Sequence, residues 1–405
     1  MPRDFREALA TSGAPSLDGV LAALDSWLIR EARFLPGNSE LLEQFCERVA
    51  ASGVAIDRVS LHQRAFHPQY RGVSRVWRRD GPLEERFLDH GIERTALYLQ
   101  SPVREAIEEV RSVEWRLEGC AKLPYPLLDE LREEGYTHYL IAPLVYSVGT
   151  VNAFSWATRR QGGFDAAERQ LFHDVQPGLA TVAELKAMRR FVASILTTYV
   201  GNEAGKLILD GQVQRGDVRE ITAALMLIDL RDFSAMSDRL SSRAVIRLLN
   251  DYFDCVMEPI RAQGGEVVEI MGDGVLAIFQ QADGGSPADA CSRALAAAIA
   301  GLDALAARNR QHPTRPLHAG FALHYGTVSY GNIGSGDRMD FTVIGPDVNL
   351  TSRIERLCRE LDRSLIMSEA FAETVHRPMW EIGHFEMRGF AKMQRLFELP
   401  PTEFA

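Results

Sequence analysis

The stretch at residues 266–279, EVVEIMGDGVLAIF, decides the fold of the second half of this chain. Two short strand patterns, 266–271 and 275–279, flank a Gly-Asp-Gly sequence, which is typical of a tight β-hairpin. Around the hairpin, the sequence predicts a strand at 223–230, a helix that begins at Ser241 or Ser242, a second helix that begins at Ser286, and a strand at 317–324. The order β-α-β-β-α-β predicts a ferredoxin-like α+β fold within the broader α/β class.

Two aspartates fall where this fold would bring them together. Asp229 ends the first strand, and Asp273 occupies the turn of the hairpin. Because the first strand of a split fold lies beside the hairpin, we expect both carboxylates at one edge of the sheet. Hard oxygen ligands in such a pair suit two divalent cations about 3.5–4 Å apart. Either aspartate alone would be interpreted as an ordinary strand-end or turn residue, but together they predict a metal site.

Five segments, in order, resemble the motifs of class III adenylate and guanylate cyclases. They are LMLIDLRDFSAMSD (225–238), LLNDYF (248–253), GGEVVEIMGDGVLAIF (264–279), YGNIG (330–334) and DFTVIGPDVNLTSRIE (340–355). The resemblance implies an enzyme that converts a purine nucleoside triphosphate to a 3′,5′-cyclic nucleotide and pyrophosphate. It also implies that Asp229 and Asp273, with the backbone carbonyl of Leu230, hold two Mg²⁺ or Mn²⁺ ions while the 3′-hydroxyl attacks the α-phosphorus.

The last of these segments carries two further candidates for catalysis. Asn349 and Arg353 are four residues apart, so on a helix they share one face. The resemblance implies that Arg353 stabilises charge on the α-phosphate and that Asn349 orients the ribose or donates a hydrogen bond. It further implies a homodimer with active sites at the subunit interface, in which one subunit supplies the metal aspartates and the other these two residues. Without the motifs, a solvated surface pair would be the preferred interpretation.

We expect one loop and one arginine to bind the triphosphate. The resemblance places Phe233 and Ser234 in the loop that cradles the phosphates, and Arg388 where the family usually has a lysine for the terminal phosphates. Two positions depart from the family pattern. Asp232 stands where glycine is common, so we expect its side chain to point away from the phosphates. Thr327 stands where some members have a phosphate-contacting arginine.

The choice of base depends on Glu269 and Thr342. Guanylate cyclases commonly have glutamate at the first position, and a carboxylate can accept from both guanine N1–H and N2–H₂. Thr342 can donate or accept, so it suits either base. The pair slightly favours GTP and cyclic GMP, with an adenylate cyclase acting on ATP as the alternative. A non-catalytic dimeric signalling module is the alternative of another class.

The first half of the chain has a different pattern of predicted elements, and the two halves meet near residue 190. We expect two helices, a strand at 58–66, paired strands at 139–146 and 150–157, and a helix that opens at Phe164–Asp165. This layout resembles a GAF sensor domain, which implies a GAF-like regulatory domain at 1–188 with an unidentified small molecule or protein as input. A dimerisation domain without a ligand predicts the same layout. Residues 189–217 would then be a helical linker, and residues 218–400 the catalytic domain.

Composition and charge indicate which partners and which cellular compartment to expect. The chain has 405 residues and a net charge of −10, whereas a nucleic-acid-binding protein needs a basic face, so we expect no nucleic-acid partner. The five cysteines are scattered and form no Cys-X-X-Cys pair, which is typical of a reducing, cytoplasmic compartment. No run of 18 apolar residues occurs, so we expect no membrane span, and we interpret the apolar stretch at 294–307 as a core helix.

Overall fold

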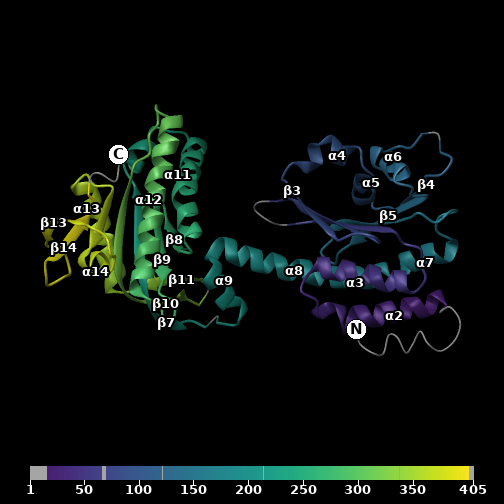
Figure 1. Cartoon of the computed structure of the whole chain (residues 1–405), viewed down its shortest axis with the longest axis horizontal. Coiled ribbons are helices and arrows are strands. Elements are labelled where there is room, and N and C mark those ends of the chain that lie inside the picture. Colours follow the sequence, from purple (N-terminus) through teal and green to yellow (C-terminus); the bar gives the residue numbers. More distant parts are fainter. Residues whose placement is uncertain (1–15, 66–69, 121, 213, 337, 401–405) are drawn as a thin grey trace. The chain divides into compact units, whose positions relative to one another are not determined.

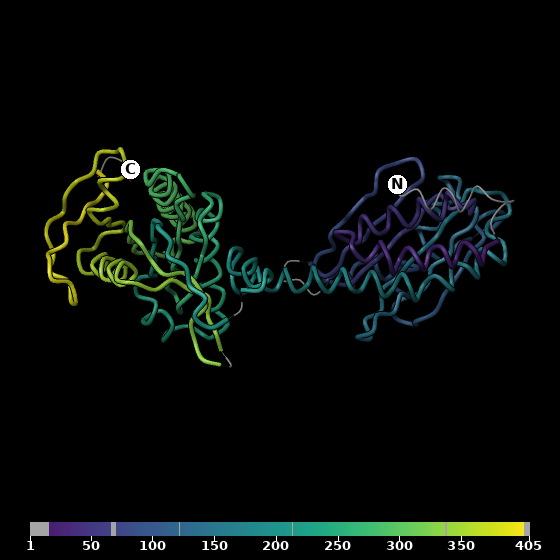
Figure 2. Tube along the Cα trace, turned by 90° about the horizontal axis from the view of Figure 1, so that it is seen from below, coloured from purple at the N-terminus to yellow at the C-terminus, as the bar shows by residue number. Residues whose placement is uncertain are grey.

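A computed structural model of the protein describes residues 16–65, 70–120, 122–212, 214–336 and 338–400. The chain divides into two compact units, Met1–Ile195 and Leu196–Ala405, and each has a sheet of its own (Figure 1). One helix, α8 (Gln176–Val200), continues without a break past the last residue of the first unit (Figure 2).

The first unit contains a six-stranded antiparallel sheet in the order β3-β2-β1-β6-β5-β4. The strands are β1 Arg58–Arg64, β2 Gly72–Arg78, β3 Glu84–Leu88, β4 Val113–Arg116, β5 His138–Val145 and β6 Val151–Thr158. The predicted strand at 58–66 therefore ends two residues early, and Phe66 lies outside the described residues. The two predicted strands of the later hairpin are confirmed to within one residue at each end, which is the usual uncertainty of element boundaries.

Helices cover both faces of this sheet. In Figure 1, α2 (Leu17–Arg30), α3 (Asn38–Ala51), α7 (Ala166–Asp174) and α8 lie on one face, and α4 (Ala96–Leu99), α5 (Pro102–Glu108) and α6 (Pro126–Glu133) on the other. Strand alternation explains the two layers: along β6, Phe154 and Trp156 pack with the first group of helices, whereas Ala153 and Ala157 pack with the second. Each face of the sheet thus has its own hydrophobic core.

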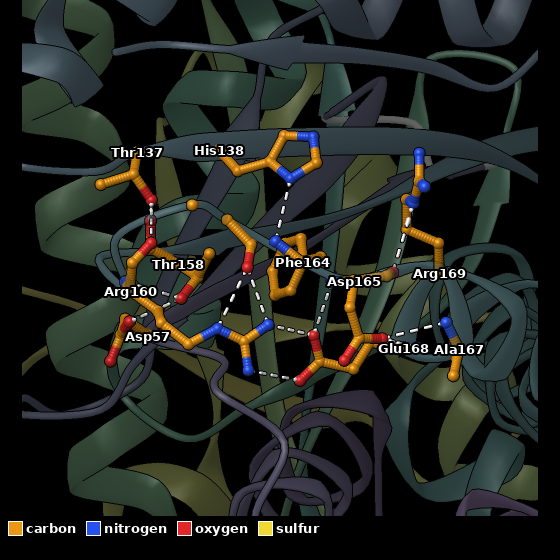
Figure 3. Close-up of polar contacts among 12 residues, drawn as sticks. Asp57, Thr137, His138, Thr158, Arg160, Phe164, Asp165, Ala167, Glu168 and Arg169 are labelled. Atoms are coloured by element: carbon orange, nitrogen blue, oxygen red, sulfur yellow. Dashed lines mark hydrogen bonds and ion pairs between the residues drawn. The ribbon is translucent and has the colours of Figure 1, made fainter.

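The start of α7 at the predicted position rests on a set of polar contacts (Figure 3). The Asp165 carboxylate accepts from the backbone N–H of Glu168 at 2.8 Å, and the Glu168 carboxylate accepts from the N–H of Asp165 at 2.9 Å. This reciprocal arrangement is a capping box, which satisfies two backbone donors that the first helical turn leaves open. Arg160 forms an ion pair with Glu168, and the N–H of Phe164 donates to Nδ1 of buried His138 at 3.1 Å. These contacts attach the loop before α7 to the sheet.

The second unit has an eight-stranded sheet with the path β13-β14-β12-β10-β7-β9-β8, to which β11 adds by pairing with β10. Its elements are α9 Asn202–Leu209, β7 Val218–Leu230, α10 Phe233–Ser237, α11 Ser242–Ala262, β8 Glu266–Met271, β9 Gly274–Gln280, α12 Pro287–Gln311, β10 Ala319–Ser335, β11 Arg338–Ile344, α13 Pro346–Glu360, β12 Leu365–Ser368, α14 Glu369–Ala372, β13 Trp380–Phe385 and β14 Gln394–Glu398. The first predicted strand, β7, lies between β10 and β9, so the predicted split β-α-β-β-α-β arrangement is confirmed.

The alternation of β7 decides where its last polar residue lies. Met226 and Ile228 pack against α11 and α12, whereas Leu225 and Leu227 pack on the opposite face of the sheet. Asp229 has the parity of the second pair and therefore lies on the face that α13 covers. This placement sets which helix can approach the carboxylate.

Strand β10 is longer than the sequence predicted. The expected strand at 317–324 extends to Ser335, because the glycines that punctuate YGTVSYGNIG allow close approach and do not end the strand. A Cβ on Gly326 would lie 2.1 Å from a carboxylate oxygen of Asp347, and one on Gly331 would lie 2.1 Å from the carbonyl oxygen of Asp217.

Within the part of the chain that the structure describes, α12 alone is long and apolar enough to cross a membrane by length and composition. One face of this helix, including Ala294, Leu295 and Ala298, is buried in the core with β7 and α11. Core helices of soluble proteins pass the same test of length and composition. The packing agrees with its interpretation as a core helix.

Candidate active site

The structure brings Asp229 and Asp273 together. Strands β7 and β9 pair antiparallel with Ile228 opposite Val275, so the end of β7 meets the hairpin turn. Burial and the neighbouring charge of Asp229 raise the pKa of Asp273 to about 6. A pair of carboxylates that repel each other in this way is a favourable setting for cations, and the carbonyl of Leu230 lies next in the chain.

No three His, Cys, Asp or Glu side chains among the described residues converge as a ready-made metal centre. Two carboxylates nevertheless fit Mg²⁺ chemistry, because Mg²⁺ keeps several waters and is held by one or two carboxylates plus substrate phosphates. One oxygen of Asp229 already has a cationic partner, since Arg359 of α13 donates to it at 2.6 Å. This arginine is a contact that the sequence analysis did not anticipate.

Two further groups that the sequence analysis missed lie beside the pair. The pKa of Glu355 on α13 is raised to about 7 by burial and then by the charge of Asp229. The Glu355 carboxylate lies close to Gly320, the strand partner of Asp229, since a Cβ on Gly320 would be 3.3 Å from a Glu355 carboxylate oxygen. Burial and the same carboxylates also raise the pKa of Tyr252, whose buried hydroxyl has no hydrogen-bond partner among the described residues. Glu355 ends the motif at 340–355 and Tyr252 lies in the motif LLNDYF, so their positions in family motifs could have marked them as candidates. Nothing in the sequence indicated what either residue does.

The two candidate base residues contact each other. The Thr342 hydroxyl, on β11, donates to a carboxylate oxygen of Glu269, on β8, at 3.0 Å. The pairing of β8 with β9 shifts between Val267 and Glu269, which leaves Val268 as the extra residue of a β-bulge. Bulges re-aim the neighbouring side chains, and here the bulge directly precedes Glu269. Glu269 remains exposed, next to exposed Ile270 and Met271.

Helix α13 places the candidate catalytic residues far from the aspartates of the same chain. Near its amino end, Asp347 accepts a hydrogen bond from the backbone N–H of Thr327 at 2.8 Å. Near its carboxyl end, Arg359 donates to Asp229. Because Asp229 pairs with Gly320 of β10, these two points are seven strand residues apart, roughly 20 Å at about 3.3 Å per residue. Asn349 is two residues from the amino end, so its amide is remote from Asp229.

The direction in which Arg353 projects from α13 also separates it from the aspartates of the same chain. Arg353 and Glu355 are two residues apart, which on a helix of 3.6 residues per turn places them about 200° apart. Glu355 faces the carboxylates, so Arg353 faces away from them. Asn349 and Arg353 are both exposed, and neither side chain forms a hydrogen bond or ion pair with another described side chain. One chain therefore separates the metal candidates from the catalytic candidates.

Comparison with known proteins places this geometry in a family. The family model described as the adenylate and guanylate cyclase catalytic domain matches residues 217–396. Residues 217–396 form a class III cyclase domain. This match spans β7 through β14 and includes both aspartates, both base residues and α13.

Two relatives and one solved structure show how far the similarity extends. An adenylate cyclase of Anabaena cylindrica is 28% identical over 201 residues, which are 48% of this chain and 38% of that protein. Adenylate cyclase 1 of Rhizobium meliloti is 31% identical over 154 residues, 38% of this chain and 23% of that protein. The chain thus spans less than two-fifths of these relatives. The crystal structure of the guanylyl cyclase Cya2 is 30% identical, with a TM-score of 0.39, over 45% of this chain and 93% of that one.

The expected triphosphate residues of the cyclase domain lie at two places. Phe233 and Ser234 form the first turn of α10, directly after β7, and Arg388 is exposed between β13 and β14. Asp232, before α10, has a left-handed backbone with φ of 58°. That conformation favours glycine and explains why glycine suits this position. Thr327 donates its backbone N–H to Asp347, so it anchors α13.

In metal-free buffer, we expect the stability of the cyclase domain to fall as pH rises from about 4.5 to about 7. A carboxyl with a raised pKa keeps its proton in the folded state while the unfolded chain releases it, so stability is lost until both states are ionised. Glu355→Gln cannot ionise and should flatten this dependence, with a melting temperature about 2–4 °C above wild type near pH 7.5.

The measurement is thermal unfolding in EDTA near pH 5 and near pH 7.5. Glu360→Gln is the matched control, because Glu360 is exposed at the end of the same helix and pairs with Arg356. Equal pH dependence in wild type and Glu355→Gln would show that Glu355 is ionised in the folded protein as it is in the unfolded chain.

Proposed function

We propose that this chain is a nucleotidyl cyclase that converts a purine nucleoside triphosphate to a 3′,5′-cyclic nucleotide and pyrophosphate, with GTP favoured over ATP. The observation that carries the proposal is the adjacent pair Asp229 and Asp273 at the end of β7 in a class III cyclase domain. The direct test is whether the purified chain, with Mg²⁺ or Mn²⁺, releases pyrophosphate and a cyclic nucleotide from GTP or ATP.

In this proposal, Asp229, Asp273 and the carbonyl of Leu230 hold two divalent cations. When bound, these cations would supply activation of the 3′-hydroxyl and neutralisation of charge on the triphosphate. The first turn of α10, with Phe233 and Ser234, offers backbone N–H groups that have no intrahelical partner. Arg388 would add a bidentate cation for the terminal phosphates.

The active site is proposed to form between two copies of the chain. Arg353 faces away from the aspartates of its own chain, and Asn349 lies toward the end of α13 opposite the Arg359–Asp229 contact, so neither can act on phosphates held there. A two-fold dimer would bring them to the aspartates of the partner and would create two equal sites. Arg353 would then meet charge on the α-phosphate, and Asn349 the ribose. Exposed apolar residues on β8 and β11, Ile270, Met271 and Met339, would suit such an interface.

The contact between Thr342 and Glu269 supports the preference for GTP. With its hydrogen donated to Glu269, the threonine leaves only acceptor atoms facing a base. Guanine presents the donors N1–H and N2–H₂ to such a pair, whereas adenine N1 is an acceptor that the carboxylate would repel. The names of two relatives, both adenylate cyclases, favour the alternative substrate ATP.

Glu269→Lys is expected to change the product. The lysine would place a donor against the guanine donors and supply one to adenine N1, so kcat/KM for GTP should fall by roughly ten- to a hundredfold and the ratio of cyclic AMP to cyclic GMP should rise. The measurement is the ratio of both products from equimolar GTP and ATP. Glu258→Lys makes the same charge change at an exposed position of α11 and should leave the ratio unchanged. A ratio unaffected by Glu269→Lys would remove Glu269 from base recognition.

The first unit is proposed to be a GAF-like regulatory domain, with residues 189–217 as a helical linker to a catalytic domain at 218–400. Its six-stranded antiparallel sheet with helices on both faces supports this assignment. A cytoplasmic location is part of the same proposal, and it is supported by five cysteines that are all free.

A further inference from the structure

A cavity of about 410 Å³ lies in the first unit between the sheet and helix α8. Its walls come from the ends of β1 and β2, from the β5–β6 hairpin, from α3, and from α8 between Glu184 and Ser194. The volume is in the range of cavities that hold small molecules in proteins. The described residues that line it all belong to the first unit.

The body of the cavity is apolar. Val73 is buried on β2, and Ala187, Met188 and Phe191 line the cavity from successive turns of α8. Met188 is 43% exposed although it lies on the side of α8 that lines the cavity, so an occupant would cover apolar surface that the protein leaves open.

Two buried polar groups at the cavity lack a partner for one of their hydrogen-bonding functions. Asn38 is 6% exposed, and its amide nitrogen donates to the carbonyl oxygen of Ala183 at 3.1 Å, which leaves its Oδ1 without a partner among the described residues. The hydroxyl of Tyr146, also 6% exposed, accepts from Gln63, and no described residue accepts its own hydrogen. A buried acceptor without a partner is unfavourable, because folding removes its hydrogen bonds to water and does not replace them. Asn38 therefore needs a donor, and Tyr146 can offer one.

The charged groups at the cavity are largely paired already. Buried Arg75 donates to Gln63 at 2.6 Å and to Ser39 at 2.9 Å, and it forms an ion pair with Glu85 at 2.5 Å. Arg190 lies 3.6 Å from the same carboxylate. Glu184 accepts from the backbone N–H and the hydroxyl of Ser147 at 2.8 and 2.7 Å. Three of the four charged side chains that line the cavity thus have partners, which favours a neutral occupant.

We propose that this cavity binds a neutral, mainly apolar molecule of one or two rings, which donates a hydrogen bond to Oδ1 of Asn38 and accepts one from the hydroxyl of Tyr146. The occupant would pack on α8 at Ala187, Met188 and Phe191, so its binding would stabilise that stretch of the helix. The inference concerns binding by the first unit and does not depend on the proposed catalytic activity.

The test uses the full chain and 2-naphthol, whose hydroxyl can both donate and accept. Titration calorimetry should detect saturable binding below about 1 mM, and 2-methoxynaphthalene, which cannot donate, should bind roughly tenfold or more weakly. Hydrogen exchange should show slower exchange of α8 amides at residues 184–194 with naphthol, and an unchanged rate in α12 of the cyclase domain. Neither readout requires turnover, so an inactive cyclase would leave this test intact.

Two variants locate the site. Tyr146→Phe removes the hydroxyl that would donate to the ligand, together with its contact to Gln63, and should weaken naphthol binding by roughly tenfold. Ala187→Trp fills the cavity and should abolish binding, and if that variant fails to fold, Tyr146→Phe decides. Ala306→Trp, the same substitution at an exposed position of α12 in the other unit, is the control and should bind normally. Absence of binding by wild type, equal affinity for both naphthalenes, or unchanged affinity in Tyr146→Phe would each overturn the proposal.

Discussion

Replacing Asp273 or Asp229 with alanine should lower kcat by on the order of a hundredfold or more, because each change removes a main electrostatic element of the site. Burial and then the neighbouring charge of Asp229 raise the pKa of Asp273 to about 6, so the pair is expected to hold cations jointly. Loss of either carboxylate should therefore raise the Mn²⁺ concentration needed for half-maximal activity as well as lower the rate.

The measurement is initial rate against Mn²⁺ concentration, with GTP and ATP tested separately. Asp238→Ala is the matched control, since Asp238 is an exposed aspartate at the end of α10 with no role in the proposed site. Excess EDTA should abolish activity in wild type. Full activity of either active-site variant, or activity that survives EDTA, would contradict the assignment of these aspartates to cations.

A mixture of inactive Asp273→Ala and inactive Arg353→Ala chains should recover activity. With random exchange, half of the dimers contain both chains, and each mixed dimer has one intact site of two, so recovery should approach about one quarter of wild-type activity. The expectation follows from α13, which carries Arg353 away from the aspartates of its own chain.

The matched control for this experiment is a mixture of Asp273→Ala with Asp229→Ala. Both changes damage the metal half of the site, so no mixed dimer can have an intact site and no activity should return. Subunit exchange is verified by mixing chains of different mass and measuring the mixed dimer directly. No recovery in either mixture despite exchange would argue that each site is built within one chain. Recovery in both mixtures would contradict the placement of Asp229 and Asp273 in the same half of one site.

Much of the fold of the second unit could be predicted because its signals are local. The continuous apolar run at 223–230 and the Gly-Asp-Gly turn at 272–274 predict β7 and the β8–β9 hairpin without any knowledge of distant residues. The split order of the elements then predicted that β7 lies beside β9, and with it the neighbourhood of Asp229 and Asp273. The strands of the first unit that were predicted, β1, β5 and β6, are neighbours in the middle of its sheet.

The sequence by itself determined the cyclase fold, the two aspartates and the pattern of motifs, because periodicity, turn chemistry and residue spacing are local properties. Tertiary structure alone decided the rest. Glu355 and Tyr252 approach the aspartates because α13 and α11 pack across the sheet, and the burial that raises their pKa values exists only in the folded chain. The bulge before Glu269 and the cavity along α8 likewise depend on pairing and packing between segments far apart in the chain, which no local pattern encodes.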